Sequence, residues 1–174
     1  GNHATLENLN IERNDSLPNR VGSSANAAIF DCDGLIRRLR VAENTSWIFD
    51  LDPMIFFPEY NILTLPGDSG GGLLGCDGRI EECEITCNGG GGITSCGAEI
   101  LRNLIRHNQG SGISGATGRI EDNHIEGNAG KWGGGINGAS GPVISNRLIA
   151  NRGRYGGASY NASGPVEGNR IERN

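Results

Sequence analysis

The feature of this chain that most constrains its fold is a nine-residue pattern that recurs along its length. In each copy an apolar residue is followed five positions later by a second apolar residue, and three positions after that by asparagine. A second block, usually two small residues and an apolar one such as Gly91-Gly92-Ile93, precedes most copies, and its apolar residue lies seven positions before the copy begins. The seven copies start at Leu6, Ile36, Ile80, Ile100, Ile120, Val143 and Val166.

The spacing of the copies predicts a solenoid of strands. Asn88, Asn108 and Asn128 are 20 residues apart, and Asn128, Asn151 and Asn174 are 23 apart. Between them lie short stretches of alternating polarity broken by glycine or asparagine, which is typical of strands and too short for helices. Glycine makes up 30 of 174 residues. We therefore predict an all-β, single-stranded parallel β-helix of about seven coils that forms one domain over residues 1–174.

Residues at the same phase of such a solenoid stack about 4.8 Å apart along its axis. The apolar positions are then expected to point inward as aliphatic columns. The asparagine that ends each copy is expected to sit at a bend, in left-handed geometry, and to bond its neighbours along the axis. This structural ladder comprises Asn14, Asn44, Asn88, Asn108, Asn128, Asn151 and Asn174.

Two stretches look like catalytic motifs, but the repeat accounts for both. The sequence AAIFDCDGLI at 27–36 resembles the Asp-x-Asp-Gly motif of haloacid dehalogenase-like phosphatases. Its Cys32-Asp33-Gly34 recurs as Cys76-Asp77-Gly78 at the same phase of another coil. The Gly-Asp-Ser-Gly-Gly at 67–71 resembles a trypsin-family motif, although its glycines belong to the repeat and no suitable histidine precedes it.

The repeat resembles that of right-handed parallel β-helix proteins in the pectate-lyase-like superfamily. It is most similar to the asparagine-rich, Gly-Gly-Ile type of bacterial secreted and surface proteins, and the resemblance covers residues 1–44 and 70–174. It implies a right-handed solenoid outside the cell or at its surface, with a structural or adhesive role, as a filament subunit or a fragment of a larger surface protein. The alternative is a carbohydrate-binding module or a polysaccharide-processing lyase, epimerase or hydrolase.

The segment 45–69 departs from the repeat, and we interpret it as an excursion between coils. It contains five of the nine aromatic residues of the chain. The simpler interpretation is a loop packed against the coil wall. The alternative is a ligand or partner surface, either a sugar-stacking platform or a subunit contact. The residues of that surface would be Trp47, Phe49, Phe56, Phe57 and Tyr60.

One outward row offers candidate catalytic groups. The second residue after the start of successive copies is Arg38, Glu82, Arg102 and Asp122. Alternating charges at strand spacing predict a salt-bridge ladder. The weaker alternative is a catalytic arrangement with Arg102 between Glu82 and Asp122. No cluster of converging carboxylates suggests calcium, so we expect neither a metal nor another cofactor.

The cysteines and glycosylation acceptor patterns give two further expectations. Cys76 and Cys96 share a phase in adjacent coils, so they are either free buried thiols or a disulfide. No spacing of the five cysteines suggests zinc. Among the acceptor patterns, Asn161-Ala-Ser lies in a predicted exposed corner and is the candidate glycosylation site, because Asn14 and Asn44 are ladder residues.

The net charge and the two ends of the sequence indicate which binding partners to expect. The net charge of −5 argues against a nucleic-acid partner, and no apolar run is long enough to span a membrane. The sequence begins within a coil and stops on Asn174, so both terminal coils would expose strand edges. We expect either a piece of a longer solenoid or head-to-tail assembly of copies. The predicted partners are therefore the chain itself or a glycan.

Overall fold

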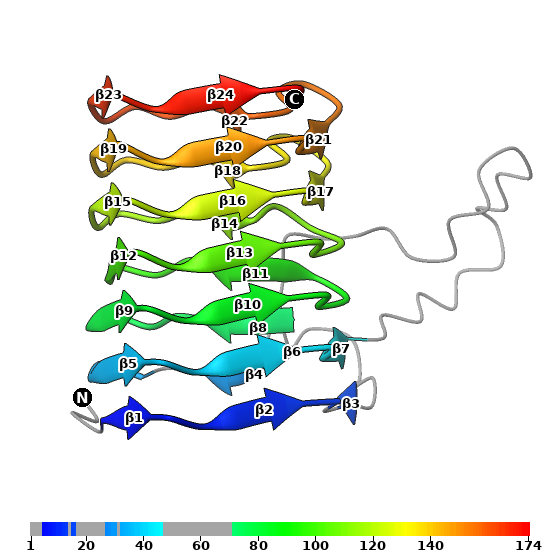
Figure 1. Ribbon diagram of the computed structural model, residues 1–174, viewed down its shortest axis with the longest axis vertical. Helices are drawn as coiled ribbons and strands as arrows, with labels where there is room; N and C mark the ends of the chain where they lie inside the picture. Colours follow the sequence, from blue (N-terminus) through cyan, green and yellow to red (C-terminus); the bar gives the residue numbers. More distant parts are fainter. Residues whose placement is uncertain (1–4, 14, 17–26, 31, 47–70) are drawn as a thin grey trace, which may run out of the picture.

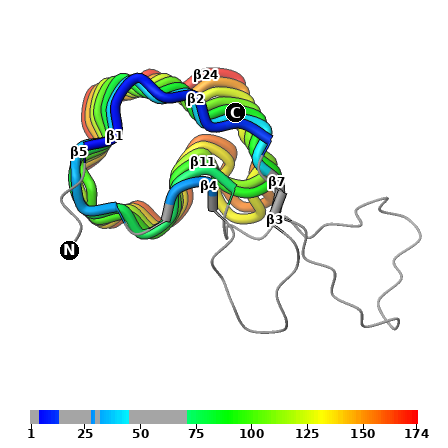
Figure 2. The backbone as a smooth tube through the Cα atoms, turned by 90° about the horizontal axis from the view of Figure 1, so that it is seen from below, coloured from blue at the N-terminus to red at the C-terminus, as the bar shows by residue number. Residues whose placement is uncertain are grey.

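The computed structural model describes residues 5–13, 15–16, 27–30, 32–46 and 71–174. These residues are all-β and wind as stacked coils around one axis, so that the three large sheets run along the length of the rod (Figure 1). The view along the axis shows the coils superimposed on a common outline (Figure 2). The predicted class, a parallel β-solenoid, is confirmed. Among the described residues, no helix has the length and apolar character needed to cross a membrane.

Three parallel sheets form the walls, and each coil contributes at most one strand to each of them. The first sheet consists of β1 (Leu6–Glu7), β5 (Leu35–Arg37), β9 (Arg79–Glu81), β12 (Glu99–Leu101), β15 (Ile120–Glu121), β19 (Val143–Ile144) and β23 (Val166–Glu167). The second consists of β2 (Asn10–Glu12), β6 (Arg40–Ala42), β10 (Glu84–Thr86), β13 (Leu104–Arg106), β16 (His124–Glu126), β20 (Arg147–Ile149) and β24 (Arg170–Glu172). The third consists of β4 (Ala27–Phe30), β8 (Gly71–Leu74), β11 (Gly91–Thr94), β14 (Ile113–Ser114), β18 (Ile136–Asn137) and β22 (Ser159–Tyr160).

Two short strand pairs lie at the corner between the second and third sheets. At one end of the rod β3 (Asp15–Ser16) pairs with β7 (Thr45–Ser46), and towards the other end β17 (Ala129–Gly130) pairs with β21 (Arg152–Gly153). All four strands follow directly after a ladder asparagine in the sequence. This corner is therefore where the solenoid accepts additional residues.

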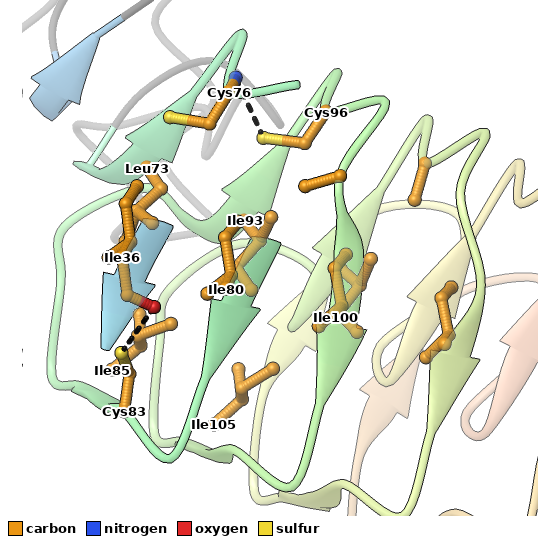
Figure 3. Packing of buried hydrophobic residues seen from close by; sticks show 14 of the residues in the cluster. Ile36, Leu73, Cys76, Ile80, Cys83, Ile85, Ile93, Cys96, Ile100 and Ile105 are labelled. Atoms are coloured by element: carbon orange, nitrogen blue, oxygen red, sulfur yellow. Dashed lines mark hydrogen bonds between the residues drawn. The ribbon is translucent and has the colours of Figure 1, made fainter. Parts of the chain in front are cut away.

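The registers confirm that residues of equal phase share a column. Ile80 pairs with Ile100, and Ile100 with Ile120. The same holds in the second sheet for Ile85 and Ile105. These side chains are fully buried. Figure 3 shows those of Ile80, Ile85, Ile100 and Ile105 inside the tube. Each buried isoleucine contributes about 1.5–3 kcal/mol relative to an exposed one, so the columns are the main stabilising element of the coil.

The asparagine ladder is continuous over the described part of the chain. The Oδ1 of Asn108 accepts hydrogen bonds from the backbone N–H and the side-chain Nδ2 of Asn88, at 3.1 and 2.9 Å. The Nδ2 of Asn108 donates to Asn128 Oδ1 and to the carbonyl oxygen of Ile85. The same side-chain bonds link Asn44, Asn88, Asn108, Asn128, Asn151 and Asn174 in order. The remaining predicted member, Asn14, lies outside the described residues.

A second asparagine ladder runs along the corner between the first and second sheets. It links Asn103, Asn123, Asn146 and Asn169 through the same Nδ2 to Oδ1 bonds. It begins at Cys83, whose backbone N–H donates to Asn103 Oδ1 at 2.9 Å. These asparagines align in the repeat, but our ladder assignment from the sequence did not include them.

Backbone geometry at the corners differs from our expectation. The ladder asparagines themselves do not have positive φ; the residue before each one does, for example Arg102 (φ 54°) and His107 (φ 54°). The left-handed residue turns the chain, and the asparagine that follows then points its amide inward to bond along the axis. Glycine supplies the left-handed residue at another corner, for example Gly115 (φ 62°) and Gly138 (φ 63°).

The predicted excursion falls mainly outside the described residues. Its first two residues, Thr45 and Ser46, form β7 within the solenoid. The strands on either side of it lie in neighbouring coils, because β6 pairs directly with β10. The five aromatic residues predicted to form a ligand or partner surface, Trp47, Phe49, Phe56, Phe57 and Tyr60, lie outside the described residues.

Candidate functional site

The row that offered candidate catalytic groups occupies the left-handed corner beside the second asparagine ladder. Glu82, Arg102 and Asp122 have φ of 54°, 54° and 55°, and their neighbour Arg38 has 53°. The strand registers on either side place them in successive coils. A left-handed residue on an outer corner directs its side chain away from the core, which is why all four are charged. The structure thus brings the three residues together as one outward column.

Their ionic contacts match the predicted salt-bridge ladder only in part: Arg38 and Arg102 both approach Glu82, at 3.0 and 3.9 Å, whereas no ion pair joins Asp122 to an arginine within the described residues. The carboxylate of Glu82 accepts bonds from Arg38 Nε at 3.0 Å and from Arg37 Nε at 3.2 Å. Arg102 Nη2 donates to Glu81 Oε2 at 2.7 Å. The hydrogen bond from Arg37, followed by that from Arg38, lowers the pKa of Glu82. A general acid for glycosidic chemistry needs a raised pKa, so these contacts favour ion pairing over proton donation.

The lowered carboxyl pKa values predict acid sensitivity. The pKa of Glu82 is lowered chiefly by Arg37, that of Glu43 by Arg13 and that of Glu121 by Arg119. A carboxyl whose pKa is lower in the folded state stabilises the fold above its unfolded pKa, and that contribution is lost as pH falls through the folded pKa.

We therefore expect the melting temperature to be constant from pH 7 down to about 5 and to decrease below about 4.5. Thermal scans across pH, by circular dichroism, measure it. The decrease should be smaller in 0.5 M NaCl because these pairs are exposed to solvent. A melting temperature that stays flat to about pH 3 would contradict this account.

None of the five cysteines forms a disulfide in the structure, and four of the five are buried. Cys76 and Cys96 stack in adjacent coils, with the backbone N–H of Cys76 donating to Cys96 Sγ at 3.3 Å and no bridge between them (Figure 3). The side-chain hydrogen bond between the two thiols, together with burial, raises the pKa of Cys96. Burial raises the pKa of Cys83 to about 11. Because the thiolate is the reactive form, these groups are chemically inert in the folded protein.

Thiol titration is expected to give one fast-reacting group per native chain at pH 8. That group is Cys87, the one exposed cysteine of the five. All five should react after unfolding in denaturant. A count of three in denaturant without reductant would show that a Cys76–Cys96 disulfide forms in solution. More than one fast thiol in the native protein would contradict the burial described here.

A cluster of three aromatic side chains lies at the corner between the second and third sheets. The rings of Trp132 and Tyr155 stack with centroids 4.7 Å apart and planes 18° from parallel. Tyr160 lies 5.7 Å from Trp132 and 5.9 Å from Tyr155. Tyr155 is 54% exposed and Tyr160 37% exposed. We call these three residues the aromatic corner.

The aromatic corner exists because the last coils are longer. Four residues separate Asn108 from the next third-sheet isoleucine, Ile113, whereas seven separate Asn128 from Ile136. The additional residues form β17, and those of the next coil form β21 beside it. The backbone N–H of Gly156 donates to the carbonyl oxygen of Trp132 at 2.9 Å, which holds the two extensions in register. Trp132 and Tyr155 therefore stack as equivalent residues of adjacent coils.

Two cations accompany the aromatic rings. Lys131 Nζ lies 5.3 Å from the centre of the Trp132 ring, and the Arg154 guanidinium lies 5.6 Å from the centre of the Tyr155 ring. Both distances are within the range of cation–π attraction. Sequence reasoning missed this surface because it searched the aromatic-rich segment 45–69. The change of period from 20 to 23 residues was the signal that could have found it.

Two further predictions concern a glycosylation site and metal binding. Asn161, the candidate glycosylation site, is exposed at a left-handed corner (φ 52°) next to Tyr160. Within the described ranges, no group of three or more His, Cys, Asp or Glu residues could hold a metal ion.

Comparison with known proteins finds no matching family model, no similar curated protein and no similar solved structure. The fold itself defines the class: this chain is a parallel β-solenoid repeat protein with asparagine ladders. Any narrower assignment has to rest on the repeat and on the surfaces described above.

Proposed function

We propose that this chain is an extracellular structural or adhesive β-solenoid, a rigid rod that carries a binding surface, in the manner of the pectate-lyase-like superfamily. The observation that carries this proposal is the column of ion pairs at Glu82 and Arg102. The charges of these two residues are bound by side chains of neighbouring coils, Arg38 and Glu81. Buried asparagine ladders support a rigid role, since fully bonded polar networks hold one register. The extracellular location is proposed because the asparagine-rich repeat resembles that of bacterial surface proteins.

The last coil exposes two apolar side chains that could take part in head-to-tail assembly. Val166 and Ile171 are 54% and 57% exposed, although their columns are buried in preceding coils. Contact with the first coil of a second copy would bury them. Head-to-tail assembly stays a prediction. Sedimentation velocity and negative-stain imaging test it.

The test of a non-enzymatic role is an assay of polysaccharide cleavage on a panel of neutral and uronate-containing glycans, with release of unsaturated uronates as one readout. The expected result is no turnover by the native chain. Turnover that disappears in Arg102→Ala but survives in Arg79→Ala, a similarly exposed and paired arginine, would overturn the proposal in favour of a lyase or hydrolase.

Carbohydrate binding is a second candidate function, and the aromatic corner is the observation that favours it. The two exposed tyrosine rings and the half-buried tryptophan ring present large, rigid apolar surfaces with polar edges, which suits the alternating apolar and hydroxyl faces of sugars. Adhesion through such a surface is compatible with a structural rod. Glycan-array binding that is lost in Tyr155→Ala would support this function, and no binding to any glycan would exclude it.

A further inference from the structure

Charge is distributed unevenly along the rod. Residues 129–174 contain six basic residues and two acidic ones, a net charge of +4. Since the whole chain carries −5, residues 1–128 carry −9. The aromatic corner belongs to the basic part. An overall negative charge thus conceals a basic end, which changes the kind of ligand that this end attracts.

The cations at the aromatic corner also differ in their partners from the described arginines of the acidic part. In the acidic part, arginines are bound by carboxylates: Arg79 Nη2 lies 2.6 Å from Glu99, and Arg106 Nη2 lies 2.8 Å from Glu84. Across the described part of the chain, no ion pair joins Lys131 or Arg154 to a carboxylate. Both are exposed. Their charges are therefore available to a ligand.

We propose that Lys131, Trp132, Arg154, Tyr155 and Tyr160 form a binding surface for a linear anionic polysaccharide, one that carries carboxylate or sulfate groups. This inference rests on the carbohydrate-binding function proposed above and names its ligand class. The guanidinium of Arg154 matches the two oxygens of a carboxylate or sulfate, and Lys131 supplies a second positive charge in the adjacent coil. The aromatic rings, two of which lie beside the cations, contact the apolar faces of the sugar units.

The spacing of the surface favours a polymer over a small anion. The backbone N–H of Arg154 bonds the carbonyl oxygen of Lys131 at 3.1 Å, so the two cations are equivalent residues in adjacent coils. A row of cations and rings along the rod axis can contact successive sugar units of one chain. No enclosed site is needed for such binding, because the ligand lies along the surface.

Binding is best measured by isothermal titration and affinity electrophoresis with three probes: polygalacturonate for carboxylate, dextran sulfate for sulfate and dextran for a neutral chain. A single-stranded oligonucleotide serves as a non-carbohydrate polyanion. The variants are Lys131→Gln/Arg154→Gln and Tyr155→Ala. The matched control is Arg79→Gln/Arg119→Gln, which removes two carboxylate-paired charges whose side chains are 49% and 42% exposed. Thermal melts confirm that each variant is folded.

The expected result is binding to at least one anionic polysaccharide that weakens about tenfold in Lys131→Gln/Arg154→Gln, weakens in Tyr155→Ala and in 0.3 M NaCl, and is unchanged in the control. Which probe binds distinguishes carboxylate from sulfate. Binding of dextran equal to that of the anionic chains, insensitive to salt, would overturn the anionic ligand but leave carbohydrate binding standing. Binding to no glycan overturns both. Equal binding of the oligonucleotide, or binding that survives both variants, overturns this assignment.

Discussion

Replacement of Asn123 by leucine is expected to lower the free energy of unfolding by about 3–5 kcal/mol. Asn123 is buried, and its Oδ1 accepts bonds from the backbone N–H and the Nδ2 of Asn103, at 2.9 and 3.0 Å. Its Nδ2 donates to the carbonyl oxygen of Ile100 at 2.8 Å and to Asn146 Oδ1 at 3.0 Å. Leucine removes all four bonds and leaves the buried backbone N–H of Asn103 without its acceptor. Chemical denaturation monitored by circular dichroism measures the change.

Shape should contribute little to this loss. A leucine, Leu39, occupies the same phase of an earlier coil and is almost completely buried there. The corner can therefore hold a leucine side chain, and the cost arises mainly from unsatisfied hydrogen bonds. The matched control is Asp122→Asn, at the adjacent exposed left-handed position (φ 55°), where asparagine is well tolerated and the change should be under about 0.5 kcal/mol. Equal unfolding midpoints for the two variants would show that the ladder does not stabilise the fold.

The columns could be predicted from the sequence because a solenoid converts spatial stacking into a fixed sequence interval. Ile80, Ile100 and Ile120 are 20 residues apart, and each contacts the next through the parallel register. The position of an inward residue within the repeat therefore identifies the residues stacked above and below it. The same logic explained why Asp33 and Gly34 did not indicate a phosphatase.

The aromatic corner could not be predicted in this way because it depends on side-chain geometry within one pair of coils. Trp132 and Tyr155 are 23 residues apart, which equals the local period, but stacking of their rings requires the strand pair β17–β21. The left-handed geometry was assigned one residue too late, to the asparagine, because asparagine has the higher intrinsic tolerance for it. In the structure, residues such as Arg102 and His107 accept this strain so that the asparagine amide can point inward.

Replacement of Gly134 by alanine is expected to be as damaging as the ladder variant, at about 3–5 kcal/mol. A Cβ atom built at Gly134 would lie 2.4 Å from the carbonyl oxygen of Arg152 and 2.5 Å from its carbonyl carbon and backbone nitrogen. All three are backbone atoms of the next coil, so no side-chain rotation can relieve the contact. The coils have to separate at this point, which breaks the hydrogen bond from the Gly134 N–H to the carbonyl oxygen of Gly156.

The same substitution links the fold to the proposed binding surface. Arg152 belongs to β21, and displacing it moves Arg154 and Tyr155 away from Lys131 and Trp132. We therefore expect Gly134→Ala to reduce the near-ultraviolet circular dichroism of the stacked rings together with thermal stability. The control in the same coil is Gly138→Ala, where the nearest atom to a new Cβ is 4.0 Å away and only the positive φ of 63° costs about 1–2 kcal/mol. If Gly134→Ala melted no lower than this control and kept the aromatic signal, the coils would not be in contact at Gly134, and the aromatic corner would not depend on their close approach.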